Sequence, residues 1–461
     1  MKKMSAWMCV ALVLAISMVL GGCGETTEPL TSATLPESQA SQTSEGQASQ
    51  TSETQAVQTT GTQVAKAPIK IGFSNSATGI YAGLGAFPYQ AWEAWAKKMD
   101  RQGGILGHPV ETFIYDSESD PAKVVLNVKN CVDTHKVQIM VAETATGNAI
   151  AGGLAAAASG VPFLAASGSS TFEKEMEKAG PDIFKWCFRG TTNSEEERVA
   201  WILQTFQQLG VRKVAVLYSE DAFGKANASV MKDYVTKYAD FGIEIIAEQS
   251  FASDAVTFGP LLSNLRAHSD LEGICVWSAT MAGALSVVAI REAGLKVPIA
   301  GDYVLALPPF TAVEKVREGL SADPGVYMPG NLSIWRELPD GLSMKAGCEV
   351  VYNFCKAEMN VEADHELYVA GVSTVLLIED VYTRLLTDQP DILDKDVETI
   401  RAAVRDYIEA TDGLNVVGTI EFSPTHHGSF VWGTYNRMAQ YGSDGKPHYL
   451  SEFAKVPVER Y

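Results

Sequence analysis

The chain of 461 residues carries 55 acidic and 36 basic side chains, which gives it a formal net charge of −19. This acidic balance argues against nucleic acid or an anionic surface as a partner. From Ile69 onward about 390 residues remain, which is more than one hydrophobic core usually supports, so we expect two lobes.

The first residues have the pattern of an export signal. Two lysines precede an apolar run over Ala6–Leu20, and Gly21-Gly22-Cys23 follows. A basic start, an apolar core and small residues before the cut describe a secretory signal peptide, and the cysteine after two glycines resembles the cleavage site of a bacterial lipoprotein. The alternative is an uncleaved membrane anchor, but the run is rather short to cross ~30 Å of hydrocarbon. We therefore expect residues 1–22 to be removed and Cys23 to carry a lipid. The protein would then be exported and lipid-anchored to the outer face of the cell membrane, or periplasmic.

Residues 23–67 are expected to form a lipidated, disordered tether. The stretch 24–66 lacks aromatic residues, is rich in Ser, Thr, Gln, Glu and Ala, and repeats QASQTSE at Gln39–Glu45 and Gln47–Glu53. Such a segment buries too little apolar surface to offset its chain entropy. As a flexible coil it would reach roughly 35 Å.

Strand, loop and helix patterns then recur at a spacing of roughly 25–40 residues, which is typical of a parallel sheet with crossover helices. The expected strands are Ile69–Phe73, Val110–Tyr115, Val137–Ala142 and Phe163–Ala165. The expected helices run to about Arg101, from Pro121 to about His135, and over Ala149–Ser159.

After Phe188-Arg189 the pattern starts again, which predicts a second α/β lobe. Its expected helices are Glu195–Leu209, Phe223–Ala239, Phe258–Arg266 and Met281–Ala293, and its strands are Lys213–Leu217, Ile243–Ala247, Gly273–Trp277 and Val297–Ala300. Val326–Met328 and Thr419–Phe422 are expected to be further strands, with a long helix at His365–Leu386 between them.

We expect the chain to cross between the lobes three times, near Gly190, Pro329 and Glu421. Lobe 1 would comprise residues 68–190 and 330–421, and lobe 2 residues 191–329 and 422–461. The predicted fold class is α/β, with two doubly wound lobes.

Two loops of small residues follow predicted strands of the first lobe. VPFLAASGSSTF covers Val161–Phe172, and ETATGN covers Glu143–Asn148. Ligands of open α/β sheets bind outside the carboxyl ends of the strands, where such loops gather. The alternative is that both are ordinary turns. We interpret them as one wall of a small-molecule site, because their N–H groups and hydroxyls suit a buried carboxylate.

The glycine-rich loop Gly79–Gly85 does not fit a nucleotide site. A phosphate loop needs a lysine after its last glycine, but Ala86-Phe87 follows Gly85, and the G-x-G-x-x-G spacing is also missing. A loop that lets the backbone and Tyr81 approach a neutral or zwitterionic ligand is the better interpretation.

Catalytic and metal-binding patterns are sparse. Neither G-x-S-x-G nor H-E-x-x-H occurs, and Thr425-His426-His427 holds the only histidine pair. A metal site needs three or four convergent ligands, so we expect a turn or link there. Asp116, Glu118 and Asp120 alternate before Pro121, which favours a solvated helix start over a calcium loop. We expect no cofactor, no metal and no enzymatic activity.

The cysteines beyond Cys23 are expected to be small buried residues. Their number is odd and none lies in a C-x-x-C pattern; they are Cys131, Cys187, Cys275, Cys348 and Cys355. The last two would share a helix face ~10 Å apart, too far for a disulfide.

An ordered set of motifs resembles the branched-chain amino acid-binding proteins of ABC importers. It begins with IKIGFSNSATGIYAGLG at Ile69–Gly85 and RQGGILGHPVETFIYDSESDP at Arg101–Pro121. It continues through VPFLAASGSSTF, FRGTTNSEEE, VRKVAVLYSEDAFGKA, REAGLKVPIAGDY and GTIEFSPTHHGS. The resemblance implies a type I periplasmic binding protein fold, in which two Rossmann-like lobes are joined by a three-crossover hinge. It also implies an extracytoplasmic solute-binding protein that delivers its ligand to a membrane permease.

The same resemblance implies which residues bind the ligand. In lobe 1 these are Thr146, with Thr144 close by, the backbone-plus-hydroxyl triplet Ser167, Gly168 and Ser169, and the lid positions Leu84 and Tyr81. In lobe 2 they are Phe223, the loop Trp277–Thr280 with Thr280 at its end, and Asp302 or Tyr303 as partner of an ammonium group.

Departures from the family pattern leave the identity of the ligand undetermined. Phe223 replaces a frequent tyrosine, and Ala279 stands where a tyrosine is usual. Aliphatic and aromatic amino acids, amides and aromatic carboxylic acids all remain candidate ligands. A sensor that passes occupancy to a receptor and an exported enzyme are the alternative functions.

Overall fold

The computed structural model describes residues 66–190, 194–428, 431, 433–453 and 455. The predicted signal peptide, Cys23 and nearly all of the predicted tether lie outside these residues. The described elements all belong to one compact unit, Gln63–Tyr461.

The first sheet contains five parallel strands in the order β2-β1-β3-β4-β5. They are β1 (Ile69–Asn75), β2 (Val110–Asp116), β3 (Ile139–Ala142), β4 (Phe163–Ala165) and β5 (Cys187–Arg189). The connecting helices are α1 (Ala82–Gln102), α2 (Pro121–Lys129), α3 (Thr146–Ala158), α4 (Ser170–Ala179) and α5 (Pro181–Phe184). The parallel sheet and its crossover helices confirm the prediction.

The second sheet has seven strands in the order β14-β13-β10-β9-β8-β6-β7. Its parallel strands are β6 (Lys213–Ser219), β7 (Glu244–Phe251), β8 (Gly273–Trp277), β9 (Ile299–Gly301) and β10 (Val326–Gly330). Its helices are α6 (Glu195–Gln208), α7 (Ala222–Lys237), α8 (Gly259–Ala267), α9 (Met281–Glu292), α10 (Pro308–Thr311) and α11 (Glu314–Ser321). The antiparallel strands β13 (Arg437–Tyr441) and β14 (Pro447–Tyr449) complete it.

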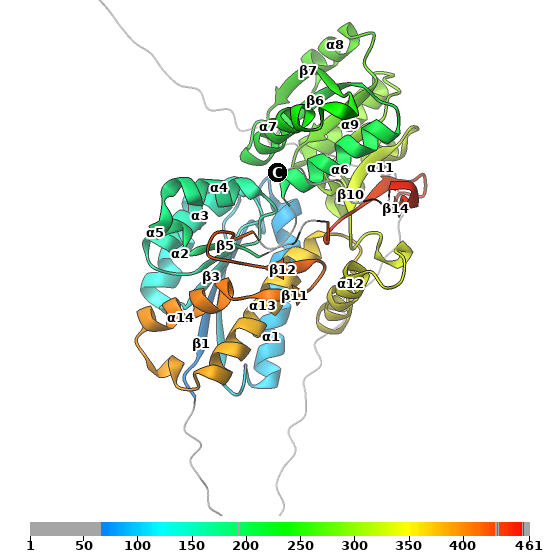
Figure 1. Ribbon diagram of the computed structural model, residues 1–461. Helices are drawn as coiled ribbons and strands as arrows, with labels where there is room; N and C mark the ends of the chain where they lie inside the picture. Colours follow the sequence, from blue (N-terminus) through cyan, green and yellow to red (C-terminus); the bar gives the residue numbers. More distant parts are fainter. Residues whose placement is uncertain (1–65, 191–193, 429–430, 432, 454, 456–461) are drawn as a thin grey trace, which may run out of the picture. The chain divides into compact units, whose positions relative to one another are not determined.

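A later segment returns to the first sheet. The long helix α13 (Leu367–Asp388) packs along α1 (Figure 1). Between them Trp92 Nε1 donates to Thr374 Oγ1 at 3.0 Å. The helices α12 (Ser343–Phe354) and α14 (Val397–Glu409) flank α13. Gly371 allows the close approach, because a Cβ there would lie 2.7 Å from Ala91 Cβ.

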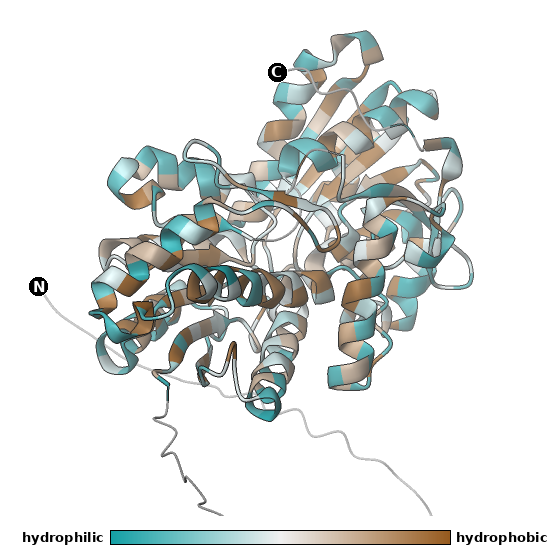
Figure 2. Cartoon of the chain, turned by 60° about the horizontal axis from the view of Figure 1, so that its bottom comes forward, coloured by the Kyte–Doolittle hydropathy of each residue, from teal (hydrophilic) through white to brown (hydrophobic). Residues whose placement is uncertain are grey.

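Apolar side chains account for both sheets. β3, β4 and β8 are buried throughout, as expected for strands covered on both faces. Brown, apolar colour runs along the strands in Figure 2, whereas the helices alternate between brown and teal. Phe73 packs against Trp92 with ring centroids 5.0 Å apart, so β1 and α1 share one core.

Several predicted elements were wrong or incomplete. The helix predicted to reach His135 ends its α-helical part at Lys129 and continues as a π-helix over Asn130–His135. Thr419–Glu421 (β12) pairs only with Asp412–Asn415 (β11), because the two form a separate hairpin. The sequence analysis also missed the helices α4, α5, α10, α11, α12 and α14 and the strands β5, β11, β13 and β14.

The expectations for the cysteines and for the acidic stretch before Pro121 are confirmed. The five cysteines within the described residues are buried and unpaired. Asp120 caps α2 and accepts from Ala122 N at 2.8 Å, with Pro121 at the first turn, so this stretch begins a helix. None of the described helices combines the length and the apolar character needed to span a bilayer. The boundaries of the lobes stay a prediction.

The histidine pair lies at a turn, as expected, with Ser423 and His426 bridged across it. His427 is buried and stacks between Phe184 and Phe188, with both ring-centroid distances at 4.2 Å. Gly428 forms a parallel bridge with Arg189 at the end of β5. In the part of the chain that the structure describes, no three His, Cys, Asp or Glu side chains converge as metal ligands would.

Candidate binding site

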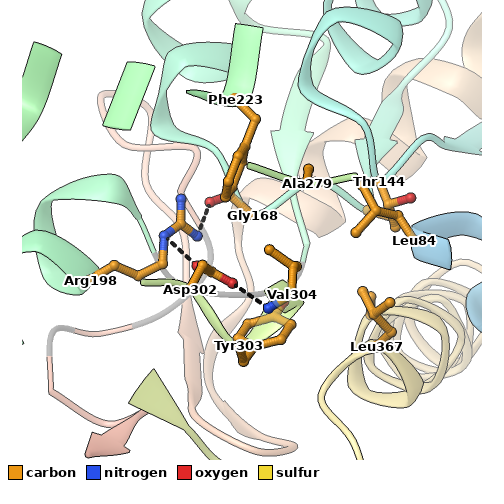
Figure 3. A pocket seen from close by; sticks show the side chains of 12 residues that line it. Leu84, Thr144, Gly168, Arg198, Phe223, Ala279, Asp302, Tyr303, Val304 and Leu367 are labelled. Carbon is orange, nitrogen blue, oxygen red and sulfur yellow. Dashed lines mark hydrogen bonds and ion pairs between the residues drawn. The ribbon is translucent and has the colours of Figure 1, made fainter. Parts of the chain in front are cut away.

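Loops at the carboxyl ends of strands from both sheets line two adjacent cavities. This is the position where parallel α/β sheets bind ligands. The first cavity, of about 30 Å³, is lined by Leu84, Thr144, Ala166, Gly168, Arg198, Phe223, Ala279, Asp302, Tyr303, Val304, Leu367 and Ala370 (Figure 3). The second, of about 50 Å³, is lined by Tyr81, Leu84, Thr144, Ala145, Thr146, Gly147, Asn148, Asp221, Ala222, Phe223 and Ala279. Because they share four residues, we treat them as one cleft.

A buried ion pair forms one side of the first cavity. Arg198 Nε lies 2.9 Å from Asp302 Oδ2, and the two side chains are 2% and 1% exposed. Arg198 Nη1 also donates to the Gly168 carbonyl at 2.9 Å, and Val304 N donates to Asp302 at 3.1 Å (Figure 3). Burial raises the pKa of Asp302, and the charge of Arg198 opposes that shift. The guanidinium carbon lies 5.2 Å from the centre of the Phe223 ring.

The loop after β3 supplies polar groups to the cleft. Thr144 lines both cavities, and its N–H and hydroxyl donate to Asn75 Oδ1 at 3.2 and 3.1 Å. Thr146 is the first residue of α3 and lines the second cavity. Tyr81 faces the same cavity, and burial, followed by the charge of Asp221, raises its pKa to about 12.

The predicted triplet Ser167–Ser169 is only partly in the cavity wall. Gly168 lines the first cavity, whereas the two serines line neither. Ser169 Oγ and Ser170 Oγ both donate to the buried Glu195 carboxylate, the second at 2.7 Å. Ser167 Oγ is buried and has no hydrogen-bond partner among the described residues. The donors of this loop therefore face a carboxylate of the chain itself.

The remaining predicted residues lie in different surroundings. Asp302 and Tyr303 both line the first cavity, and Ala279 lines both cavities. Trp277 lies fully buried in the core of the second sheet. Thr280 Oγ1 donates to the Ser253 carbonyl at 2.6 Å. The structure thus brings together most of the predicted residues, but not Trp277, Thr280, Ser167 and Ser169.

The sequence analysis missed several cavity residues, among them Arg198, Asn148, Asp221, Val304, Leu367 and Ala370. Arg198 follows three glutamates near a predicted crossing, and a lone basic residue there was the available signal. Leu367 and Ala370 come from α13, and no local pattern indicates that this helix reaches the cleft.

Strand ends of two parallel-rich sheets thus border one cleft, which is where open α/β sheets bind small molecules. The family model described as periplasmic binding protein matches residues 68–428, and the chain belongs to this family. The resemblance seen in the sequence is thereby confirmed.

Solved structures agree in fold. An extracellular ligand-binding receptor from Rhodopseudomonas palustris is 22% identical, with 84% of this chain and 100% of that chain covered and a TM-score of 0.72. A branched-chain amino acid transporter substrate-binding protein from Streptococcus pneumoniae, solved with isoleucine, is 20% identical over 82% of this chain and 97% of that one, with a TM-score of 0.65. An ABC transporter substrate-binding protein from Desulfitobacterium hafniense, solved with leucine, is 16% identical over 83% and 100%, with a TM-score of 0.62.

Proposed function

We propose that this protein binds an amino acid or a related small carboxylate in the cleft and delivers it to the permease of an ABC importer. The observation that carries the proposal is the pair of adjoining cavities beside the strand ends of both sheets, the first of which is lined by the buried Arg198–Asp302 pair. The relatives of the same fold that were solved with isoleucine and leucine support the ligand class.

The polar and apolar groups of the cleft suit a zwitterion. Asp302 would accept hydrogen bonds from the ligand's ammonium group, and Arg198, Thr144 and Thr146 would receive its carboxylate. Leu84 and Phe223 would contact the side chain. Ser167, Ser169, Trp277 and Thr280 line neither cavity and would contact the ligand only after the lobes rearrange.

Ligand exchange would require the lobes to separate. Cavities of about 30 and 50 Å³ hold only a few water molecules. We propose that the lobes, 68–190 with 330–421 and 191–329 with 422–461, rotate about their three links and close again over the ligand. A lipid on Cys23 would keep the closing lobes near the permease.

A thermal-shift screen of the purified protein against amino acids, amides and aromatic carboxylic acids tests this function. A ligand at 100 times its Kd should stabilise the folded state by about 2.7 kcal/mol, because it binds only that state. We expect at least one amino acid or small carboxylate to raise Tm. If none does, the proposed ligand class is wrong, and turnover of a bound compound would contradict a transport role.

Ser169→Ala tests the proposed contribution of the loop after β4. We expect ligand affinity to fall roughly 10- to 160-fold, since a hydrogen bond to a charged group contributes ~1.5–3 kcal/mol. Titration calorimetry measures this change. Ser263→Ala is the matched control, because Ser263 lies exposed on α8 and donates only to the Gly259 carbonyl of its own helix. Unchanged affinity in Ser169→Ala would show that Ser169 hydrogen-bonds Glu195 but does not contribute to ligand binding.

A further inference from the structure

A buried carboxyl group that has no positively charged partner among the described residues lies next to the cleft. Glu143 follows β3, is fully buried and has a φ of 56°, a left-handed conformation uncommon for residues other than glycine. Ser74 Oγ donates to its Oε1 at 3.0 Å, and Ser76 Oγ and Asn148 Nδ2 donate to its Oε2 at 3.2 and 3.4 Å. The backbone N–H of Glu143 also donates to the Ser74 carbonyl at 3.0 Å, which fixes the turn.

The elements packed around this carboxyl group present neutral groups to it. They are Ser74, Asn75 and Ser76 from β1 and the residue after it, Ser117 after β2, Asn127 of α2 and Asn148 of α3. The charged side chains of the same elements are engaged elsewhere or exposed. Asp116 accepts from Ala77 N and Thr78, Lys70 pairs with Glu111, Lys123 pairs with Glu118, and Lys129 is exposed.

The ionised carboxylate therefore has hydrogen bonds but no ion-pair partner among the described residues. Burial raises the pKa of Glu143 to about 7, although the surrounding hydroxyls and amide favour the ionised form. Near neutral pH, Glu143 is therefore expected to be partly protonated and partly ionised. The protonated carboxyl group can instead donate to one of the serine oxygens that face it.

This carboxyl group is connected to the cleft through two residues. Thr144, the next residue in the chain, lines both cavities, and Asn148 lines the second one. Asn148 Nδ2 lies within hydrogen-bond distance of both Glu143 Oε2 and Ser76 Oγ. Across the same cavity lie Asp221 and Tyr81, which add no positive charge.

We propose that Glu143 takes up one proton from solvent when a carboxylate ligand binds in the cleft, and thereby makes carboxylate binding depend on pH. The inference rests on the proposed function and adds its regulation. The ligand's negative charge near Thr144, Thr146 and Asn148 disfavours the Glu143 carboxylate, so the balanced change is carboxylate plus proton to carboxylic acid. Above the pKa of Glu143 the affinity should fall, because each binding event must then supply that proton.

The first test needs no amino acid ligand. Acetate is a small carboxylate, and acetamide is its neutral counterpart of the same shape. The ¹³C resonance of the Glu143 carboxyl group, assigned by its loss in Glu143→Gln, is titrated with pH in the presence of each compound. We expect acetate, but not acetamide, to move the midpoint of the titration upward. Equal midpoints, or a midpoint near that of an ordinary glutamate, would overturn the proposal.

The second test counts protons during binding by the wild-type protein. L-leucine and L-isoleucine, followed by every compound that raises Tm, are titrated by calorimetry in phosphate and in Tris, whose ionisation heats differ. We expect close to one proton taken up about one pH unit above the pKa of Glu143, and none in Glu143→Gln. A count near zero for a bound carboxylate would refute the idea, whereas the absence of any binding would instead refute the proposed function.

The variant also separates a proton-linked role from a merely structural one. Affinity of the wild-type protein should fall up to about tenfold per pH unit above the pKa of Glu143, while Glu143→Gln stays level and binds more tightly than wild type there. Weaker binding by Glu143→Gln at every pH would overturn the inference. Glu197→Gln is the matched control, because burial also raises the pKa of Glu197 to about 7 but this residue lines neither cavity. Its proton count should equal that of wild type.

Discussion

Replacing Arg198 with methionine is expected to lower the free energy of unfolding by about 3–5 kcal/mol. The substitution keeps much of the side-chain volume but leaves the Asp302 carboxylate buried, 1% exposed, without its cation. It also removes the donor to the Gly168 carbonyl and thereby loosens the loop after β4. Urea unfolding followed by circular dichroism measures the change.

Two further variants identify the cause of this loss. Arg198→Met combined with Asp302→Asn should regain much of the stability, because the second change removes the unpaired buried charge. Arg336→Met is the control for losing an arginine, since Arg336 is more than half exposed in its contact with Glu362. If the single variant unfolds at the wild-type urea concentration, the Arg198–Asp302 pair does not stabilise the closed cleft as we describe.

Replacing Ala279 with leucine is expected to weaken ligand binding at least 100-fold. Ala279 lines both cavities, so three additional carbon atoms would occupy the space proposed for the ligand. Overpacking of this kind also costs about 1–3 kcal/mol of stability. Calorimetric titration with the compound that gives the largest Tm shift measures the affinity.

Ala306→Leu provides the matched control for Ala279→Leu. Ala306 lines a neighbouring cavity of about 220 Å³, which shares only Tyr303 with the cleft and has room for the same added atoms. This variant should retain wild-type affinity. Full binding by Ala279→Leu would place the ligand outside the cleft, and equal loss in both variants would indicate a general effect on folding.

Local patterns were sufficient to predict the parallel strands other than the short strand β5. Buried runs such as Ile139–Ala142 and Gly273–Trp277 are apolar throughout, and turn residues bound them. Strand β14, with the sequence PHY, has no such pattern, because it is held by pairing with β13 rather than by burial. Helix α4 was missed because its first residues, Ser170-Thr171, continue the composition of the loop before it.

In the cleft, too, local sequence patterns predict the positions of some residues but not of others. Thr144 and Gly168 lie in loops that follow β3 and β4, so strand positions predict them in the cavity wall, whereas Phe223 was predicted from the family resemblance. The position of the Ser169 hydroxyl depends on Glu195, which lies 26 residues further along the chain. Contacts across such separations are set by tertiary packing, and a sequence pattern contains no sign of them.

The most direct test of the central proposal is a crystal structure of the protein with the compound that raises Tm most. The account predicts electron density for this compound in the cleft, with its carboxylate near Thr144 and Arg198 and its ammonium group near Asp302. Density for the compound elsewhere, such as in the cavity beside Tyr441, with the cleft holding only water, would contradict it.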